Sequence, residues 1–259
     1  MNIGIIGGGA IASFLLKEIN HNQVPGLYVQ SIYIRDEEKY SALTKNYGVG
    51  LYSDLSQFLA SDIDIIVEAA NIQAVRKLIP AVLKKKDVIL ISIGALSEEL
   101  LYQNIYAVAE KYKRIVYLPS GAIGGLDLLQ SAHALGGVHE VSLTTRKPAR
   151  SLLDEEEVDK EVVIFDGTAN EAIKKFPKNI NVSIILSLAG IGIQKTRVKI
   201  IADPVIENNS HMINISGTFG TASFSINNAP MATNPKTSYA AALSVLSTLQ
   251  RCTSNIKLG

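Results

Sequence analysis

One histidine of the chain stands among residues that suit proton transfer. His211 follows the segment ADPVIENNS, in which Asp203 and Pro204 are succeeded by Asn209. A carboxylate or an amide at these positions is able to orient an imidazole ring, and histidine has an unperturbed pKa of about 6.5, which suits a general acid or base near neutral pH. The same histidine begins the segment HMINISG, which is typical of a strand, so a packed structural role is the alternative. Other segments of the sequence are needed to distinguish a catalytic from a structural role for His211.

A glycine loop near the N-terminus has the spacing of a dinucleotide site. Gly7, Gly9 and Ala12 follow the pattern G-x-G-x-x-A between the apolar segment NIGIIG and the helical segment AIASFLLKEIN. In this pattern the first glycine permits a tight turn, the second lets the backbone approach a pyrophosphate, and the third position allows close packing of helix and strand. The helix start, with Ala10 and Ile11, offers free N–H groups to phosphates. The alternative is a tight turn that binds no ligand.

The end of the second predicted strand bears on the choice between NAD and NADP. An acid that binds the adenosine ribose is expected about 20 residues after the glycine motif. Ile34 occupies that position, and Arg35 and Asp36 follow it. An isoleucine cannot accept a hydrogen bond, whereas a guanidinium pairs with a 2′-phosphate, so the sequence favours NADP. In the alternative, Arg35 only covers the adenine and Asp36 binds the ribose, which leaves NAD open.

The first half of the chain alternates buried strands with helices. The apolar segments lack polar alternation, which is typical of parallel strands covered on both faces. We predict a doubly wound α/β domain of the Rossmann type. Its predicted strands are 2–7, 27–34, 63–70, 87–94 and 114–119, and its predicted helices are 10–20, 36–48, 72–86 and 98–112.

The second half has a different rhythm. Period-two alternation in HMINISG predicts a sheet with one covered face, and we predict an α+β domain with a mixed sheet. The predicted domains are residues 1–119, which bind the dinucleotide, and residues 120–234, which are expected to carry catalysis and oligomerisation. A terminal helix within residues 235–259 is expected to pack back on the first domain. The predicted strands are 140–148, 161–167, 196–203, 211–217 and 222–228, and the helices are 125–135, 169–176, 180–190 and 235–251.

Composition excludes several classes of protein. The 259 residues carry 25 basic and 24 acidic side chains, a balance that does not favour a nucleic acid or an anionic membrane as partner. The single cysteine excludes an intramolecular disulfide and a cysteine-rich metal site, so no metal is expected. We find neither the pattern of a signal peptide nor that of a membrane span, and we expect a cytoplasmic protein.

Several segments together resemble the L-aspartate dehydrogenase family. They are LPSGAIGGLDLLQSA (118–132), TTRKPARSL (144–152), KFPKNINVSIILSLAG (175–190), ADPVIENNSH (202–211) and NPKTSYAAALSVL (234–246). With the glycine loop, the resemblance extends over essentially the whole chain. It implies a Rossmann domain followed by an α/β domain that supplies the active site and the interface of a homodimer. It also implies oxidation of L-aspartate to iminosuccinate with NAD(P), hydrolysis to oxaloacetate and ammonia, and in some organisms a supply of iminosuccinate for NAD biosynthesis.

The resemblance assigns a role to the histidine of the opening segment. The family motif D-P-x(4)-N-x-H is matched by Asp203, Pro204, Asn209 and His211, and the family's histidine is the proposed catalytic acid/base. The chain departs from the family at Ile34, where an aspartate is common. This difference concerns the choice of dinucleotide and not the reaction.

A dicarboxylate substrate also needs sites for its anionic groups. The turn SGAI presents backbone N–H groups that suit a carboxylate, although a glycine-rich hinge has the same composition. The segment KTS, predicted at a helix start, is a second anion-favouring position, and it also reads as an ordinary helix start. The predicted substrate-binding residues are Ser120, Ala122, Ile123, Asn181, Asn209, Lys236 and Thr237. The predicted cofactor-binding residues are Gly7, Gly9, Ala10, Ile11, Arg35, Asp36, Ala69, Ala122 and Asn181.

Two other functions are compatible with the same residues. One is a dehydrogenase for another amino or imino dicarboxylate. The other is a non-catalytic sensor that binds NADP through its first domain and signals through its second. A sensor would bind the dinucleotide tightly without turnover.

Overall fold

The computed structural model describes residues 1–153, 158–176 and 181–256. Ile180 of one predicted helix and residues 257–259 of the terminal segment lie outside the described residues. The contacts between residues divide the chain into two compact units. The first comprises residues 1–119 together with the terminal helix from Ala242 onward, and the second comprises residues 120–241.

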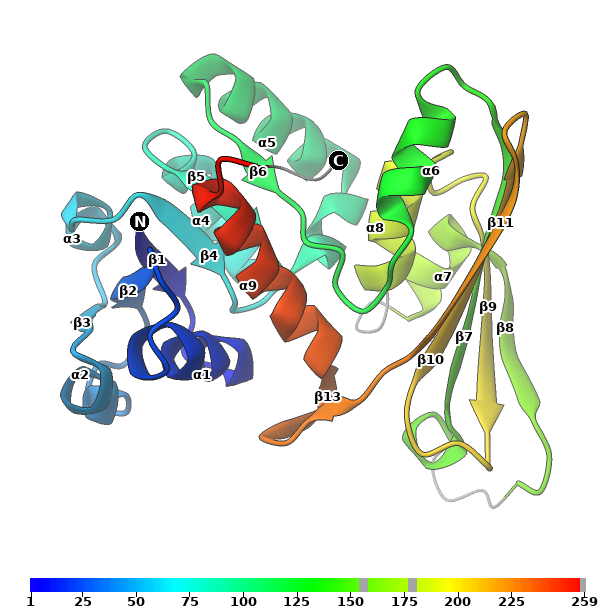
Figure 1. Cartoon of the computed structure of the whole chain (residues 1–259), viewed down its shortest axis with the longest axis horizontal. Coiled ribbons are helices and arrows are strands. Elements are labelled where there is room, and N and C mark those ends of the chain that lie inside the picture. The colour runs from blue at the N-terminus through cyan, green and yellow to red at the C-terminus, as the bar shows by residue number, and fades with distance from the viewer. Residues whose placement is uncertain (154–157, 177–180, 257–259) are drawn as a thin grey trace. The chain divides into compact units, whose positions relative to one another are not determined.

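A six-stranded parallel sheet forms the centre of the first unit (Figure 1). The strands lie in the order β3-β2-β1-β4-β5-β6, and every neighbouring pair is parallel. This is the predicted Rossmann topology, and the prediction of a doubly wound sheet is confirmed. The strands are β1 Asn2–Ile6, β2 Tyr28–Tyr33, β3 Gly50–Tyr52, β4 Ile65–Glu68, β5 Asp87–Leu90 and β6 Val116–Tyr117.

Helices connect these strands, which accounts for their continuous apolar sequences. Ile3, Ile5 and Ile66 are fully buried, as expected of strands that have no face in water. The helical elements are α1 Ala10–Leu15, its π-helical continuation η1 Leu16–His21, α2 Ser41–Tyr47, α3 Leu55–Ala60, α4 Ile72–Val82, the 3-10 turn η2 Ile93–Ser97, α5 Glu99–Tyr112 and α9 Tyr239–Thr253.

Two features of the first unit differ from the sequence prediction. The helix predicted over 36–48 begins only at Ser41, because Asp36 Oδ1 accepts a hydrogen bond from the Lys39 N–H at 3.1 Å and stabilises a turn. The predicted stop at Gly48 is correct, since that residue is left-handed with φ of 70°. Strand β3 and helix α3, which Asp54 caps, were not predicted.

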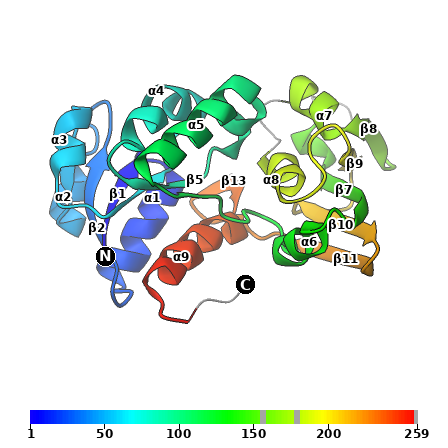
Figure 2. The same cartoon turned by 90° about the horizontal axis from the view of Figure 1, so that it is seen from above.

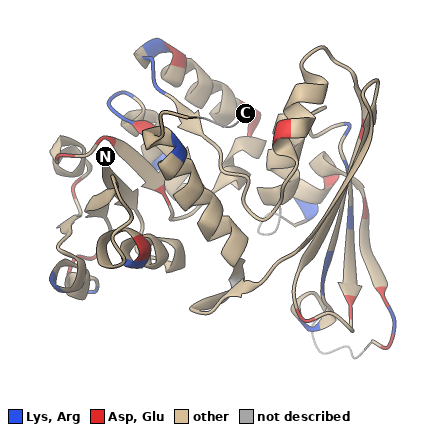
Figure 3. Ribbon diagram, in the orientation of Figure 1, with Lys and Arg blue, Asp and Glu red and all other residues tan. Residues whose placement is uncertain are grey.

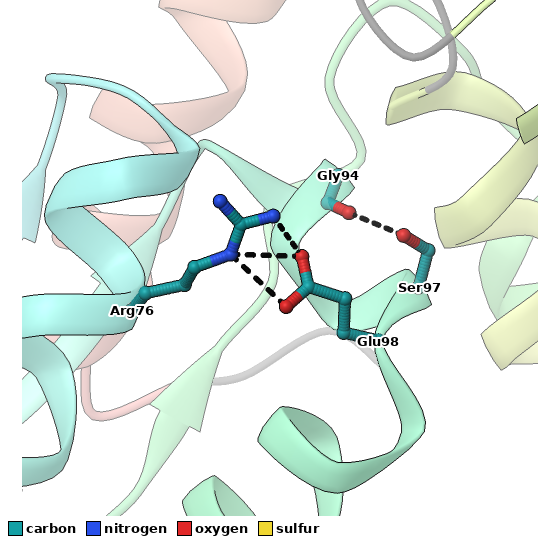
Figure 4. A network of polar contacts seen from close by, with 4 residues as sticks. All are labelled: Arg76, Gly94, Ser97 and Glu98. Carbon is teal, nitrogen blue, oxygen red and sulfur yellow. Dashed lines mark hydrogen bonds and ion pairs between the residues drawn. The ribbon is translucent and has the colours of Figure 1, made fainter. Parts of the chain in front are cut away.

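Polar contacts fix the turn that follows β5 (Figure 4). Arg76 of α4 donates from Nε to both carboxylate oxygens of Glu98, at 2.9 and 3.0 Å, and Glu98 directly precedes α5. Within the turn, Ser97 Oγ donates to the Gly94 carbonyl at 2.8 Å. Because the ion pair is solvent-exposed, it contributes little to stability and serves mainly to set the start of α5 against α4.

The second unit is built on a five-stranded mixed sheet with the order β11-β10-β7-β9-β8. Only the pair β7–β9 is parallel. Helices α6, α7 and α8 lie on one side of this sheet (Figures 1 and 2), and the prediction of a mixed sheet is confirmed. The elements are α6 Leu126–His133, β7 Val138–Pro148, the 3-10 turn η3 Ala149–Ser151, β8 Val162–Thr168, α7 Ala169–Lys175, α8 Asn181–Ala189, β9 Arg197–Asp203, β10 Ser210–Gly217 and β11 Gly220–Asn227.

The start of the terminal helix was predicted wrongly. Residues 234–238 form the short strand β13, which pairs with β12 Pro230–Met231, and α9 begins only at Tyr239. The backbone of Tyr239 donates to the Ala229 carbonyl at 2.9 Å, which holds the chain in a hairpin up to the first residue of the helix. Proline near a helix start fits many helices, but here pairing with β12 outweighs that local preference.

Basic and acidic side chains are nearly equal in number, in keeping with the formal net charge of +1. They are interspersed along the ribbon as far as Glu207, whereas residues 208–250 carry Lys236 as their one charged residue (Figure 3). Among the described residues, no helix is long and apolar enough to cross a membrane, and no group of three or more histidine, cysteine or acidic side chains is arranged to hold a metal ion.

Candidate functional site

The glycine loop lies at the carboxyl end of β1, and its first two glycines are required by the fold itself. Gly7 has φ of +109°, and a side chain there would meet the Ala69 carbonyl oxygen at 2.7 Å. A side chain at Gly8 would meet the ring of Tyr40 at 2.5 Å. The loop therefore packs closely against the turn after β4 and against Tyr40, which leaves these two glycines explained by internal contacts.

Gly9 is different, because nothing inside the unit requires a glycine there. Its φ of −84° is open to any residue, and no atom lies within 4 Å of the position that a side chain would occupy. The Gly9 carbonyl accepts the first helical hydrogen bond, from the Ser13 N–H at 3.0 Å. The open space in front of the backbone, together with the helix start at Ala10 and Ile11, fits the close approach of a pyrophosphate.

The residues that follow β2 lie as expected of a site in which no acid binds the adenosine ribose. Ile34 is buried, so its side chain belongs to the core, while Arg35 and Asp36 are exposed. The Asp36 carboxylate caps the turn that ends at Lys39. This contact gives Asp36 a structural function and leaves Arg35 as the residue suited to a 2′-phosphate.

A buried carboxylate ties together two loops at the same edge of the sheet. Glu68, at the end of β4, is fully buried and accepts hydrogen bonds at 2.9 Å from the Ala70 N–H, the Ser92 N–H and the Ser92 hydroxyl. Burial raises the pKa of Glu68, and the hydrogen bonds oppose that shift. Because the Gly7 turn packs on Ala69, Glu68 also fixes the support of the glycine loop.

His211 lies on the helix-covered face of the second sheet. In the register of β10 it stands opposite Thr145 on β7 and Ile226 on β11, and its side chain is 6% exposed. Its Nδ1 lies 3.0 Å from Thr145 Oγ1, and among the described residues only Thr145 hydrogen-bonds to the ring. Lys147, two residues after Thr145 on the same strand, projects to the same face. The sheet thus places an imidazole, a hydroxyl and an ammonium side by side.

The environment keeps His211 neutral near pH 7. Burial lowers the pKa of His211 from its ordinary 6.5 to about 4, and the charge of Lys147 adds to this shift. Burial also lowers the pKa of Lys147. A neutral imidazole beside a cation has the lone pair that a proton acceptor needs, and the cation suits an anionic ligand.

Asp203 does not orient His211, which corrects one of the two predicted partners. The register of β7 with β9 places Asp203 beside Pro148, on the face opposite to Thr145. Its carboxylate lies 3.4 Å from Arg146 Nη1 and accepts a hydrogen bond from the Val205 N–H at 2.9 Å. Asn209 stands two residues before His211, and its backbone carbonyl accepts a hydrogen bond from the Asn228 N–H at 2.9 Å.

The remaining predicted substrate residues occupy three segments. Ala122 and Ile123 are buried in the turn after Ser120, and Gly121 in that turn has φ of +66°. Asn181 is the exposed first residue of α8.

The third segment is β13, where the predicted helix start is replaced by a strand. Thr237 accepts a hydrogen bond at Oγ1 from Asn234 Nδ2 at 3.0 Å, while the side chain of Lys236 lies outside what the structure describes. The helix-start argument for an anion site at Lys236 and Thr237 is therefore wrong, because the helix begins only at Tyr239.

Two family models together match most of the chain. Residues 7–119 match the model described as "Homoserine dehydrogenase, NAD binding domain", and residues 127–252 match "Aspartate dehydrogenase, C-terminal". The L-aspartate dehydrogenase of Methanosarcina mazei is 38% identical over 273 residues, which covers 100% of this chain and 99% of that protein. The chain belongs to the L-aspartate dehydrogenase family. A second member, from Methanococcus maripaludis, is 38% identical over 268 residues, with 100% and 99% covered.

Solved structures agree with this family. Aspartate dehydrogenase from Thermotoga maritima superposes with a TM-score of 0.83 at 32% identity, covering 100% of this chain and 99% of that one. A homoserine dehydrogenase from Thiobacillus denitrificans has a TM-score of 0.58 at 14% identity, covering 96% of this chain and 72% of that one, and shares the fold alone. The family and the NAD-binding match confirm the prediction of a dehydrogenase that uses NAD or NADP.

Two residues that lie beside His211 on the sheet were not predicted from the sequence. Thr145 and Lys147 lie in TTRKP, a segment that was predicted as the end of a strand and contributes to the resemblance, but that was not assigned to the site. The period of two along a strand places them on one face, but nothing local indicates that this face also carries His211. That information lies in the pairing of β7 with β10.

Proposed function

We propose that this chain catalyses the NAD(P)-dependent oxidation of L-aspartate to iminosuccinate, which water converts to oxaloacetate and ammonia. His211 is the general acid/base of this reaction. The observation that carries the proposal is the neutral, Thr145-bonded imidazole beside Lys147, in a chain of the L-aspartate dehydrogenase family.

The proton chemistry follows from the two ring nitrogens. The substrate ammonium must lose a proton before the carbon–nitrogen double bond forms. When Nδ1 carries its proton and donates to Thr145, Nε2 has the lone pair that accepts this proton, and the imidazolium keeps the same bond to Thr145. His211 then holds a proton to return as water adds to the imine carbon. Bound NAD(P) supplies the hydride acceptor, for which the glycine loop and Arg35 provide the binding residues.

The charge beside the ring matches a dicarboxylate. Lys147 supplies a positive charge on the face of the sheet that carries His211. A carboxylate near Lys147 offsets that charge and favours the imidazolium, so substrate binding raises the pKa of His211 from about 4 towards neutrality. His211 is thus neutral in the free enzyme, and it becomes a stronger base when the dicarboxylate is bound.

The substrate is tested by scanning purified protein with aspartate, glutamate and alanine, each with NAD and with NADP. Turnover with aspartate well above that with the other two supports the proposal. Preference for another amino dicarboxylate would retain the reaction and change its substrate. Tight dinucleotide binding without turnover on any of the three would instead indicate a sensor.

We expect Arg35→Ala to discriminate between the two dinucleotides. If the exposed guanidinium pairs with a 2′-phosphate, its loss removes a charge-assisted contact that contributes roughly 1.5–3 kcal/mol, or about 10- to 150-fold in affinity. Titration should show this loss for NADP and little change for NAD. Equal NADP affinities before and after the arginine change would rule out the assignment.

A homodimer through the second sheet completes the proposal. Helices α6, α7 and α8 cover one face, while the other presents Met212, which is 39% exposed, and Val163, which is 52% exposed. An uncovered sheet face with apolar side chains suits a second copy of the chain. Sedimentation should give twice the 27.9 kDa of one chain, and Met212→Arg should shift the protein to monomers. A monomeric parent protein would contradict this part of the proposal.

Each proposed domain has its own function in this reaction. Residues 1–119 hold the dinucleotide, residues 120–234 supply catalysis and the dimer interface, and the terminal helix returns to the first domain. A cytoplasmic location is consistent with the single cysteine, and iminosuccinate made there is available for NAD biosynthesis.

A further inference from the structure

A buried asparagine joins three segments of the candidate site. Asn228 lies between β11 and β12 and is 4% exposed. Its Nδ2 donates to the Ala122 carbonyl at 3.1 Å, its Oδ1 accepts from Ser238 Oγ at 2.6 Å, and its backbone N–H donates to the Asn209 carbonyl at 2.9 Å. One residue thus connects the turn after Ser120, the start of the strand that carries His211, and the end of β13.

The orientation of this amide is fixed by its partners. A carbonyl oxygen can only accept a hydrogen bond, so the nitrogen of the Asn228 amide must face Ala122. The oxygen then faces Ser238, whose hydroxyl donates. With both ends engaged inside the unit, the Asn228 side chain serves to hold the three segments together.

The bond to Ala122 determines where an adjacent donor points. In a trans peptide, the carbonyl of one residue and the N–H of the next lie in one plane and point in opposite directions. Fixing the Ala122 carbonyl towards Asn228 therefore directs the Ile123 N–H away from Asn228. Among the described residues none accepts a hydrogen bond from this N–H, although Ile123 is only 6% exposed. A backbone donor without a protein partner, in a residue that is itself largely buried, suits a ligand oxygen.

We propose that Asn228 is a positioning residue, which aims the Ile123 N–H at a carboxylate of the substrate and holds this turn to the strand of His211. The inference rests on the proposed function, because it takes the ligand to be a dicarboxylate. Asn228 itself touches no substrate. Its contribution is expected in substrate affinity and not in the proton step.

Asn228→Asp is the variant that tests the inference. It keeps the size of the side chain and an acceptor for Ser238, but it places a carboxylate oxygen opposite the Ala122 carbonyl, which repels it. We expect the KM for aspartate to rise roughly tenfold or more, as the loss of one buried hydrogen bond implies. The kcat and the dinucleotide Kd should change less than threefold, which is about 0.65 kcal/mol. Ser238→Ala, which removes only the bond to Oδ1, should give a smaller rise in KM.

A matched control separates positioning from general destabilisation. Asn20 Nδ2 donates to the carbonyls of Val29 and Tyr47 at 2.9 and 3.0 Å, in the first unit. Asn20→Asp therefore creates the same repulsion away from the second unit. It should lower the melting temperature as Asn228→Asp does, but leave the KM for aspartate unchanged. An equal rise in KM in both variants would overturn the inference, as would a parental KM in folded Asn228→Asp.

A binding measurement distinguishes failure of this inference from failure of the proposed function. Succinate, a dicarboxylate that cannot be oxidised at an amine, is titrated into the parent protein and into Asn228→Asp in the presence of NADP. Weaker succinate binding by the variant supports the positioning role even if the parent does not oxidise aspartate. Equal succinate affinity in the two proteins overturns it, whatever the substrate is.

Discussion

Replacing His211 with asparagine should lower aspartate turnover by roughly 10²–10⁴-fold, the contribution that a positioned proton-transfer group typically makes. Asparagine keeps the polarity and much of the shape of the ring, but it cannot exchange a proton near neutral pH. Dinucleotide affinity should barely change, because the glycine loop belongs to the other unit. Turnover and melting temperature measured on the same sample distinguish catalysis from packing. A destabilised variant with full activity per folded molecule would end the catalytic assignment.

The pH dependence of this variant provides a second readout. Since the pKa of His211 in the free protein is about 4, kcat/KM of the parent should rise as pH increases through that value, where the imidazole becomes neutral. This acid limb should be absent in His211→Asn. The control is His139→Asn, the same change at an exposed histidine of β7, which should keep both the rate and the limb.

Stability should follow the same ionisation. The pKa of His211 is lower in the folded protein than its ordinary 6.5, so the unfolded chain binds the proton more readily. The stability that neutral His211 contributes is therefore present above pH 6.5 and is lost as the pH falls from 6.5 towards 4. Over this pH window the melting temperature of the parent protein should fall by more than that of His211→Asn, whose side chain does not titrate.

Local sequence was sufficient for much of the fold. The unalternating strands, such as 87–94, indicated a parallel sheet, because only strands covered on both faces keep apolar residues at every position. Local patterns failed where a distant partner decided the structure. Residues 234–238 have the proline and polar residues of a helix start, yet they pair with β12 as a strand. A helix was also predicted over 36–40, where a side chain caps a turn.

The two halves of the candidate site differ in how far the sequence describes them. The glycine loop is a local structure, so spacing alone predicted its place between β1 and α1. The surroundings of His211 depend on which strands pair. Thr145 is 66 residues away in the chain, and its contact with the ring follows from the register of β7 and β10. The motif suggested Asp203 because it is near in sequence, but the register of β9 places it on the other face.

Replacing Gly9 with valine should abolish tight dinucleotide binding while the protein stays folded. The added side chain would fill the space through which a pyrophosphate approaches the backbone, so several phosphate contacts would be lost, and affinity should fall roughly hundredfold or more. Fluorescence titration with NADPH measures the loss. Unchanged titration in a folded variant would show that the loop is only a turn.

The Gly9 variant should keep its stability while it loses affinity for the dinucleotide. Since φ is −84° and no atom lies within 4 Å of the new side chain, the substitution creates no clash. Restriction of the unfolded chain offsets the loss of a glycine at the N-cap of α1, so the melting temperature of the free protein should change little. Gly7→Val is the matched control. There φ is +109° and the side chain would meet the Ala69 carbonyl at 2.7 Å, so stability should fall together with binding. If both variants lost stability alike, Gly9 would be a structural glycine, and the open space in front of it would not be the site of the pyrophosphate.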